Sequence, residues 1–363
     1  MMRILYTIGT RPEVIRSAAI IRELGKVSTI GLDLVNTGQH YDRAMMSDLV
    51  HELGVPPATH MLSRATGNAA RRIGLLVKDL ADVLAINSYD AIVVYGDTDS
   101  SLAAALAGVK CCIPVVHIEA GCRSGDLRMQ EELNRRMIDH VSALNLAVSE
   151  NCITNLQRES VPGRVVLTGD PQFDVFVANS PEVVRREDRL KQGFVTMHRA
   201  ENVDDPQFLS ALVNSLGSWG EGGVVSFLWP AHPRTAGFFA GFDMPECVKI
   251  VTPMSYRDAL GQLSQSVVCI TDSGGLQKEA FWLQVPCVTM RRSTEWIETV
   301  EANANMLVPN PSELHGAIRH IMTSAERIAW APDPYGGIDS ARRVARAIAS
   351  WVLEKHSWMS EST

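Results

Sequence analysis

The sequence predicts an α/β protein that contains two doubly wound, Rossmann-like domains. Short apolar runs of strand length alternate with segments of helix length from one end of the chain to the other. Two such series follow one another, and a charged segment with two prolines separates them. The 363 residues, of which 46% are hydrophobic and 21% charged, are enough for two domains that each bury a core. Strands that alternate with helices form parallel sheets with helices on both faces.

The first series predicts an N-terminal Rossmann-like domain over residues 1–170. Its apolar runs of strand length are residues 3–8, 32–37, 91–95, 114–118, 144–148 and 165–168. The helical patterns between them are residues 13–24, 69–85, 100–107 and 131–142.

The second series predicts a C-terminal Rossmann-like domain over residues 171–338. Its strands are expected at residues 193–197, 224–229, 248–251, 267–271, 287–290 and 305–308. The join is expected within residues 170–192, which contain two prolines and a charged run. Residues 339–363 carry apolar positions at helical spacing, followed by a tail, and this helix is expected to pack back on the N-terminal domain.

Composition and motif searches exclude several function classes. The net charge of −7 argues against a general nucleic-acid or membrane binder. The seven cysteines show no metal-ligand spacing, and we expect neither a metal nor a cofactor. No apolar run approaches the ~18 residues needed to span a bilayer, and the first residues lack a cleavage site, so we expect a cytoplasmic protein. The chain also lacks a GxGxxG after its first strand, a Tyr-x-x-x-Lys pair and a P-loop.

Polar segments follow the expected strands where ligands bind to doubly wound sheets. Such sheets bind ligands beyond the carboxyl ends of their strands, at the point where the strand order reverses. The polar segments here begin after residues 8, 95, 118, 197, 229 and 271. If the two domains face each other, these loops line one interdomain cleft.

Three carboxylates of the first domain are candidates for acid–base chemistry. Asp97 follows a buried-type strand, Glu119 lies one residue beyond another, and Glu131 opens a helix. Crowded carboxylates resist ionising together, which separates their pKa values and suits proton transfer. The alternative is structural. Asp97 or Asp99 would then cap the next helix, and Glu131 would pair with Arg135 four residues on.

The turn after the first strand offers cations for an anionic ligand. Gly9 and Pro12 suit a tight turn and the first residues of a helix, which explains most of residues 9–13 without a function. The turn and the helix start do not require Arg11. Its guanidinium can bind phosphate through two hydrogen bonds. Arg16, one turn further on, would strengthen the site.

Residues 272–279 form the strongest motif of the second domain. Gly274 and Gly275 let the main chain approach a ligand, and the following helix points its free N–H groups at a diphosphate. Glu279, one turn inside that helix, is placed to accept from ribose hydroxyls. The alternative is a plain strand–turn–helix. His198 lies at another strand end and gives an electropositive tip, and Arg291 adds a cation.

Taken together, these segments resemble the non-hydrolysing UDP-N-acetylglucosamine 2-epimerases, a family with a two-domain GT-B-like fold. The resemblance covers nearly the whole chain and rests on residues 9–13, 37–40, 96–98, 117–121, 131–135, 198–202 and 272–279. It implies catalytic roles for Asp97, Glu119, Glu131 and His198. It implies UDP contacts by Arg11, Ser273, Gly274, Gly275 and Glu279, to which we add Arg16, Arg135 and Arg291 as substrate-binding candidates. Gln39 and His232 match positions of an allosteric site found in some members.

The resemblance also implies a reaction. UDP and the C2 proton leave a UDP-N-acetylhexosamine to give a 2-acetamidoglucal, and both then add back with inversion at C2. A homodimer is expected from the family alone. Residues 277–282 and 294–298 are similar to a subgroup that acts on UDP-2,3-diacetamido-2,3-dideoxyglucuronate. A hydrolysing relative that releases UDP and a GT-B glycosyltransferase remain alternatives, whereas a non-catalytic sensor would not need these carboxylates.

Overall fold

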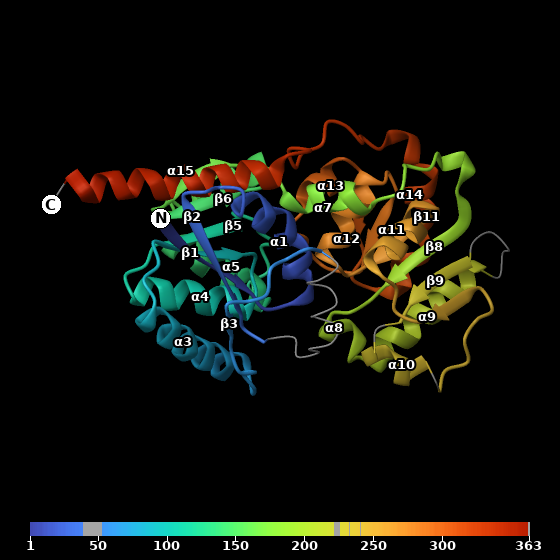
Figure 1. The fold of residues 1–363 in the computed structure, drawn as a ribbon. Coiled ribbons are helices and arrows are strands. Elements are labelled where there is room, and N and C mark those ends of the chain that lie inside the picture. The colour runs from blue at the N-terminus through green and yellow to red at the C-terminus, as the bar shows by residue number, and fades with distance from the viewer. Residues whose placement is uncertain (39–52, 221–225, 232, 240, 362–363) are drawn as a thin grey trace. The chain divides into compact units, whose positions relative to one another are not determined.

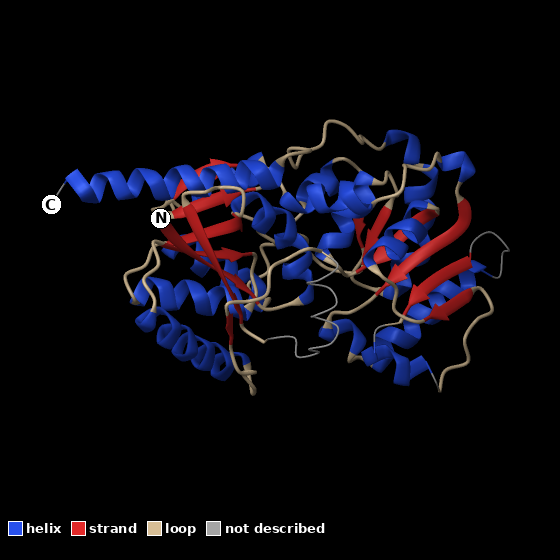
Figure 2. Ribbon diagram, viewed as in Figure 1, coloured by secondary structure: helices blue, strands red, loops and turns tan. Residues whose placement is uncertain are grey.

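The computed structural model describes residues 1–38, 53–220, 226–231, 233–239 and 241–361. The chain divides into two compact units, one of Met1–Ala178 with Pro334–Thr363 and the other of Asn179–Asp333. Each unit contains one sheet of parallel strands with helices on both faces (Figures 1 and 2). The expected domain boundaries, after residues 170 and 338, stay predictions.

The sheet of the first unit has the strand order β3-β2-β1-β4-β5-β6-β7. Its strands are β1 (Met2–Ile8), β2 (Ile30–Asn36), β3 (His60–Met61), β4 (Ala91–Tyr95), β5 (Val115–Ala120), β6 (Leu144–Ala147) and β7 (Arg164–Leu167). Every residue of β4 and β5 is buried, as expected for central strands that are covered on both faces.

Helices cover both faces of this sheet. They are α1 (Arg11–Leu24), α3 (Ala69–Ile86), α4 (Asp99–Lys110), α5 (Gln130–Val141), α6 (Glu150–Arg158) and α15 (Ser340–Glu361). A further helix, α7 (Pro171–Asn179), follows β7 where the first segment of this unit ends. Alternate residues of the strands point to opposite faces. Tyr6 and Val93 pack into a core with α1 and α15, whereas Leu5 and Ile92 pack into a second core with α3 and α4.

The C-terminal helix α15 belongs to the first unit. Val344 and Ile348 are buried in the same core as β1 and α1. Arg343 donates to the main-chain oxygens of Thr168, Gly336 and Ile338, which fastens the start of α15 to the end of β7.

The sheet of the second unit has the order β10-β9-β8-β11-β12-β13. Its strands are β8 (Leu190–Thr196), β9 (Ser226–Pro230), β10 (Val248–Val251), β11 (Ser266–Thr271), β12 (Cys287–Thr289) and β13 (Asn305–Leu307). Its helices are α8 (Ala200–Val203), α9 (Pro206–Gly220), α10 (Pro233–Phe239), α11 (Tyr256–Ser264), α12 (Gly274–Trp282), α13 (Ile297–Glu301) and α14 (Leu314–Thr323). Short 3₁₀ turns lie at Arg186–Asp188, Pro311–Glu313 and Ala325–Arg327.

The strands predicted from apolar runs are all confirmed, with ends that differ by a few residues. The prediction missed β3, which has two residues and pairs with the end of β2 at Val35 and Asn36. A strand this short cannot show the alternation or the apolar run by which strands are recognised.

Candidate active site

The strand orders bring together loops that are far apart in the sequence. In the first sheet the order reverses between β1 and β4, and in the second between β8 and β11. Neighbouring connections leave toward opposite faces at such a point, so a crevice opens beyond the carboxyl ends of the two strands. The predicted site residues follow β1, β4 and β5 in one unit and β8 and β11 in the other.

A buried carboxylate, Glu13, joins the first two of these loops. The hydroxyl of Thr10 caps α1, and the Glu13 carboxylate in return accepts from the main-chain N–H groups of Gly9 and Thr10, both at 2.7 Å. Its other oxygen accepts from the Thr98 hydroxyl at 2.6 Å, at the start of α4. Burial raises the pKa of Glu13, and the Thr98 hydrogen bond opposes that shift. The side chain therefore fixes the loop after β1 against the loop after β4.

Asp97 lies at the carboxyl end of β4 and does not cap the next helix. Thr98 caps α4 by accepting from the N–H of Ser101, and Asp99 pairs with Arg72 at 2.6 Å. The Asp97 carboxylate instead contacts the guanidinium of Arg135 on α5. Capping, the structural alternative for Asp97, is therefore wrong, and its carboxylate remains a candidate for chemistry.

Glu119 is buried and has an unusual backbone. Its φ of 72° lies in the left-handed region, which costs a residue other than glycine roughly 1–3 kcal/mol and persists only where the surroundings determine it. The carboxylate pairs with Arg16 on α1, at 3.0 and 3.3 Å from the guanidinium nitrogen Nη1. Arg16 in turn lies 4.8 Å from the ring centroid of Tyr95. The pair passes over Gly96, where a Cβ atom would lie 3.5 Å from Arg16 and 3.6 Å from Glu119.

Helix α5 presents a polar face to the core. Its buried residues are Glu132, Asn134, Arg135, Ile138 and Asp139. Asn134 donates to the main-chain oxygen of Asp97 at 2.8 Å, and Glu132 accepts from the N–H of Ser124 at 2.8 Å. Buried polar groups are retained only where they are hydrogen-bonded, so this face binds the loops after β4 and β5 in fixed positions.

Arg135 corrects one expectation. Its ion pairs are with Asp97 and Glu132, not with Glu131, the partner that the spacing suggested. Glu131 is half-buried in the first turn of α5, whereas Glu132 is fully buried. The buried face of the helix runs through positions 132, 135 and 139, so Arg135 pairs with the buried carboxylate of Glu132 and not with half-buried Glu131.

His117 and Asp139 form a buried pair between β5 and α5. The His117 Nδ1 atom lies 2.6 Å from Asp139 Oδ1, and its Nε2 atom lies 2.9 Å from the main-chain oxygen of Gly96. The other Asp139 oxygen accepts from the N–H of Gly121 at 3.1 Å and from Arg123 at 2.6 Å. Burial alone would raise the pKa of Asp139, but the charge and hydrogen bonds of His117 and Arg123 hold it below its ordinary value.

In the second unit, buried Asp272 joins the loops after β8 and β11. It accepts from the main-chain N–H groups of His198 and Arg199 and from the side chain of Asn202, all at 3.0–3.2 Å. Its Oδ1 atom also lies 2.9 Å from His198 Nδ1. Burial would raise the pKa of Asp272, but the hydrogen bond and charge of His198, together with the Asn202 and Arg199 donors, lower it. His198 is thereby oriented while its side chain stays 47% exposed.

The predicted diphosphate motif forms the start of α12. The hydroxyl of Ser273 caps the helix by accepting from the N–H of Leu276, and Gly274 and Gly275 form its first turn. Glu279, one turn further on, is buried and accepts from the hydroxyl of Tyr256 at 2.9 Å. A Cβ atom on Gly274 would lie 3.2 Å from the indole nitrogen of Trp296. A side chain at this position would therefore displace the indole by a few tenths of an ångström.

Arg291 lies in the same unit and is tied to a carboxylate. Its guanidinium donates two hydrogen bonds to Glu295, at 2.9 and 2.8 Å, and both residues are buried. Lys278 is also fully buried, with its ammonium 3.6 Å from the ring centroid of Trp296. A substrate contact by Arg291 stays a prediction, as does one by Arg16.

Three predicted residues are outside what the structure describes. Arg11 is the first residue of α1, but its side chain lies outside the described part, and Gln39 and His232 lie outside it altogether. The predicted allosteric role of Gln39 and His232 therefore stays a prediction.

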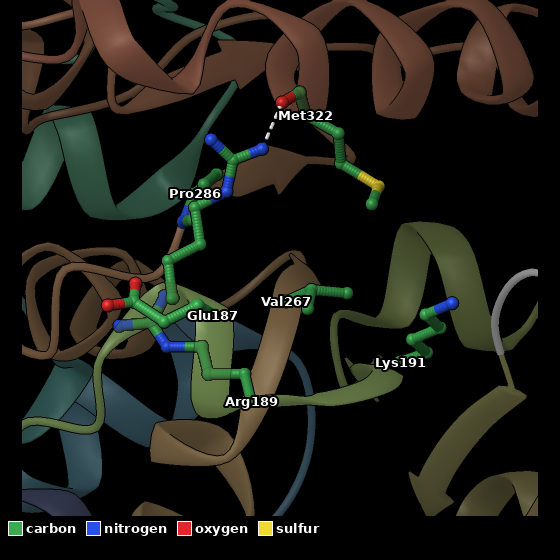
Figure 3. Close-up of a pocket in the computed structure, with 7 residues that line it drawn as sticks. Glu187, Arg189, Lys191, Val267, Pro286 and Met322 are labelled. Atoms are coloured by element: carbon green, nitrogen blue, oxygen red, sulfur yellow. Dashed lines mark hydrogen bonds between the residues drawn. The ribbon is translucent and has the colours of Figure 1, made fainter.

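A pocket of about 220 Å³ lies at the amino ends of strands in the second sheet, opposite the ends where the predicted site residues lie (Figure 3). Its lining residues are Arg186, Glu187, Arg189, Lys191, Val267, Pro286 and Met322, near the amino ends of β8, β11 and β12. Buried Arg189 donates to the main-chain oxygens of Val184, Leu283 and Gln284. This arginine thereby stabilises the carboxyl end of α12, and the pocket is separate from the candidate site.

Two searches complete the description. Within the described ranges, no helix has both the length and the apolar character that crossing a bilayer requires. No group of three His, Cys, Asp or Glu side chains in that part of the chain is arranged to hold a metal ion.

The sequence reasoning placed His117 and Asp272 within site motifs without giving either of them a role, and it missed Asp139. A signal was present for α5, because charged residues recur at positions 132, 135 and 139, the spacing of one helix face. A charged stripe on a helix that must cover a central strand indicates buried ion pairs rather than a solvated face.

Comparisons with known proteins agree on one family. The family model described as UDP-N-acetylglucosamine 2-epimerase matches residues 22–349. A UDP-2,3-diacetamido-2,3-dideoxy-D-glucuronate 2-epimerase of Pseudomonas aeruginosa is 35% identical, over 96% of this chain and 99% of that protein. A UDP-N-acetylglucosamine 2-epimerase of Methanocaldococcus jannaschii is 33% identical, over 96% and 99%.

Solved structures give the same result. The crystal structure of the M. jannaschii UDP-GlcNAc 2-epimerase in complex with UDP-GlcNAc and UDP is similar with a TM-score of 0.86 and 32% identity, over 96% of this chain and 100% of that one. The Neisseria meningitidis UDP-GlcNAc 2-epimerase bound to UDP-GlcNAc has the same TM-score at 26% identity, with the same coverage. The predicted GT-B-like α/β fold class is confirmed. That the two sheets face one cleft stays a prediction.

Proposed function

This chain belongs to the UDP-N-acetylglucosamine 2-epimerase family, and we propose that it interconverts UDP-GlcNAc and UDP-ManNAc by inversion at C2 without hydrolysis. The observation that supports this most directly is Glu119. It is a buried carboxylate on a left-handed backbone, and it lies in the last two residues of the central strand β5, where the pairing with β6 shifts register.

In this proposal the first unit moves protons. Asp97, Glu119 and Glu131 are the candidates to remove the C2 proton and to return one on the opposite face. Two of them are bound in defined positions, Asp97 by Arg135 and Glu119 by Arg16. Fixed carboxylates suit this role because proton transfer requires the acceptor within hydrogen-bond reach of the proton.

The second unit binds the leaving group. The N–H groups at the start of α12, behind Ser273, Gly274 and Gly275, offer donors to a diphosphate. Glu279 would accept from the ribose hydroxyls, and Tyr256 orients its carboxylate. His198, oriented by Asp272, would stabilise negative charge as UDP leaves. Because the intermediate must be recaptured, UDP has to stay bound throughout.

A second candidate substrate is UDP-2,3-diacetamido-2,3-dideoxyglucuronate. The P. aeruginosa relative, whose name gives that substrate, is 35% identical over nearly all of both chains. Trp296 lies in the segment 294–298 that is similar to this subgroup, and its indole packs beside Gly274 at the start of α12. The reaction at C2 would be the same.

Solvent exchange tests the proposal. The protein is incubated with UDP-GlcNAc in deuterated water, and the C2 position is followed by NMR. Epimerisation predicts deuterium at C2 and a mixture of gluco and manno sugars still joined to UDP. Accumulation of free UDP would indicate a hydrolase, and no exchange would indicate a transferase or a sensor. A parallel incubation with the diacetamido-uronic substrate identifies the sugar, because the preferred substrate exchanges with the higher kcat/KM.

A homodimer and a cytoplasmic location complete the proposal. Both are expectations from the sequence. Light scattering of the full chain at two concentrations tests the first, and fractionation of the source cells tests the second.

A further inference from the structure

The His117–Asp139 pair connects the two loops that carry the proposed proton-transfer groups. His117 contacts the carbonyl of Gly96, the residue before Asp97. Asp139 accepts from the N–H of Gly121, two residues after Glu119. One buried pair, with neither side chain exposed to solvent, therefore holds the main chain next to both candidate carboxylates, just before Asp97 and just after Glu119.

Both loops need such support because their backbones are strained or unusual. Gly96, Glu119 and Gly121 have φ angles of 73°, 72° and 81°. A left-handed glutamate costs roughly 1–3 kcal/mol and persists only when the surroundings determine it. The contacts to Gly96 O and Gly121 N are made by the main chain itself, so they act on the backbone that aims the carboxylates.

The hydrogen bonds also define the protons on the pair. Gly96 O can only accept, so His117 Nε2 donates to it. Asp139, whose pKa burial would raise but His117 and Arg123 lower, is ionised and accepts from Nδ1. Arg123, the cation beside Asp139, also pairs with the carboxylate of Glu159 at 2.7 Å.

We propose that His117 and Asp139 are positioning residues of the epimerase: a buried, hydrogen-bonded histidine–carboxylate pair that sets the geometry of Asp97 and Glu119 without touching the substrate. The role rests on the proposed function. If the pair is lost, the proton-transfer groups should move, whereas the nucleotide contacts of the second unit should stay intact.

Kinetics of Asp139→Asn and His117→Asn provide the first test. A displacement of about 1 Å at the reacting groups lowers kcat on the order of 10²-fold, whereas KM and the Kd for UDP should stay within about twofold. The matched control is Ser142→Ala, at the carboxyl-terminal cap of α5, which removes a buried hydroxyl that donates to Ile138 O at 2.8 Å and should leave kcat unchanged. A folded Asp139→Asn protein with wild-type kcat, or a loss confined to KM, would overturn the proposal.

NMR of the wild-type chain provides the second test, and it does not depend on either variant folding. In ¹⁵N-histidine-labelled protein, the Nε2 proton of His117 should be detected and protected from exchange with solvent, because it donates to Gly96 O inside the core. A His117 Nε2 that carries no proton would contradict the pair as described. If instead the NMR result holds but the wild-type protein gives no C2 exchange with either substrate, the proposed function fails and the ion pair stands.

Discussion

The two units place their polar residues at equivalent points of two parallel sheets, between β1 and β4 in one and between β8 and β11 in the other. In the first, carboxylates are bound by guanidinium groups, as Glu119 is by Arg16 and Asp97 by Arg135. In the second, the buried carboxylate of Asp272 accepts from main-chain N–H groups and orients His198.

This difference shows how one topology supports two kinds of chemistry. The first switch point has a polar helix, α5, whose buried side chains fix the neighbouring loops. The second has a helix start, α12, whose glycines leave room for a ligand next to free N–H groups. Fixed carboxylates suit proton transfer, and a helix start suits anion binding. Each unit can therefore be impaired without the other, and single substitutions in either unit test that separation.

The largest effect is expected for Glu119→Gln. Gln keeps the size of the side chain and can accept from Arg16, but it is not basic. C2 exchange should fall by roughly 10²–10⁴-fold, the contribution that general acid–base groups typically make. The Kd for UDP, measured by calorimetry, should stay within about twofold because the proposed UDP contacts belong to the other unit. Loss of UDP binding would mean that the carboxylate is structural.

Glu279→Gln should give the converse result. An amide accepts hydrogen bonds less strongly than a carboxylate, so the Kd for UDP should rise on the order of tenfold. C2 exchange at saturating substrate should change little, because the carboxylates of the first unit are untouched. Glu301→Gln, an exposed residue at the end of α13, is the matched control and should bind UDP as the wild type does. If Glu279→Gln lowered kcat as much as Glu119→Gln does, proton transfer and UDP binding would not be divided between the two units.

The fold was predictable because its strands are short apolar runs between helical patterns. The residues of β4, for example, are all apolar and all buried. The location of the candidate site was predictable for a related reason, since parallel strands place their carboxyl ends at one edge. The loops that begin after Ile8, Tyr95 and Thr271 therefore had to lie at the ligand-binding edge of their own sheets.

The partners within the site were not predictable. Arg16 and Glu119 are 103 residues apart in the sequence, and Asp272 and His198 are 74 apart. Such pairs depend on strand order, which the apolar pattern does not specify. Local spacing was also misleading for Arg135, because the i,i+4 rule describes exposed helix surfaces and this arginine lies on the buried face.

The smallest effect is expected from Asp272→Asn, and it concerns stability. Both Asp272 oxygens accept from N–H donors, so the amide of Asn must direct one NH₂ group at another donor. An unsatisfied buried donor costs about 1–3 kcal/mol, which should lower the thermal midpoint of the second unit at neutral pH.

The pH dependence gives this prediction its sign. The folded pKa of Asp272 is below its ordinary value, because the His198 contacts outweigh burial, whereas the unfolded chain titrates near about 3.9. The native state keeps a charge that the unfolded state loses, so the stabilisation is complete above about pH 5 and declines as the pH falls through the folded pKa. The difference in midpoint between wild type and Asp272→Asn should therefore shrink in acid, whereas exposed Asp243→Asn should show no such trend. A difference that grows below about pH 4 would mean that Asp272 is protonated in the folded protein, and that it does not orient His198 through its charge.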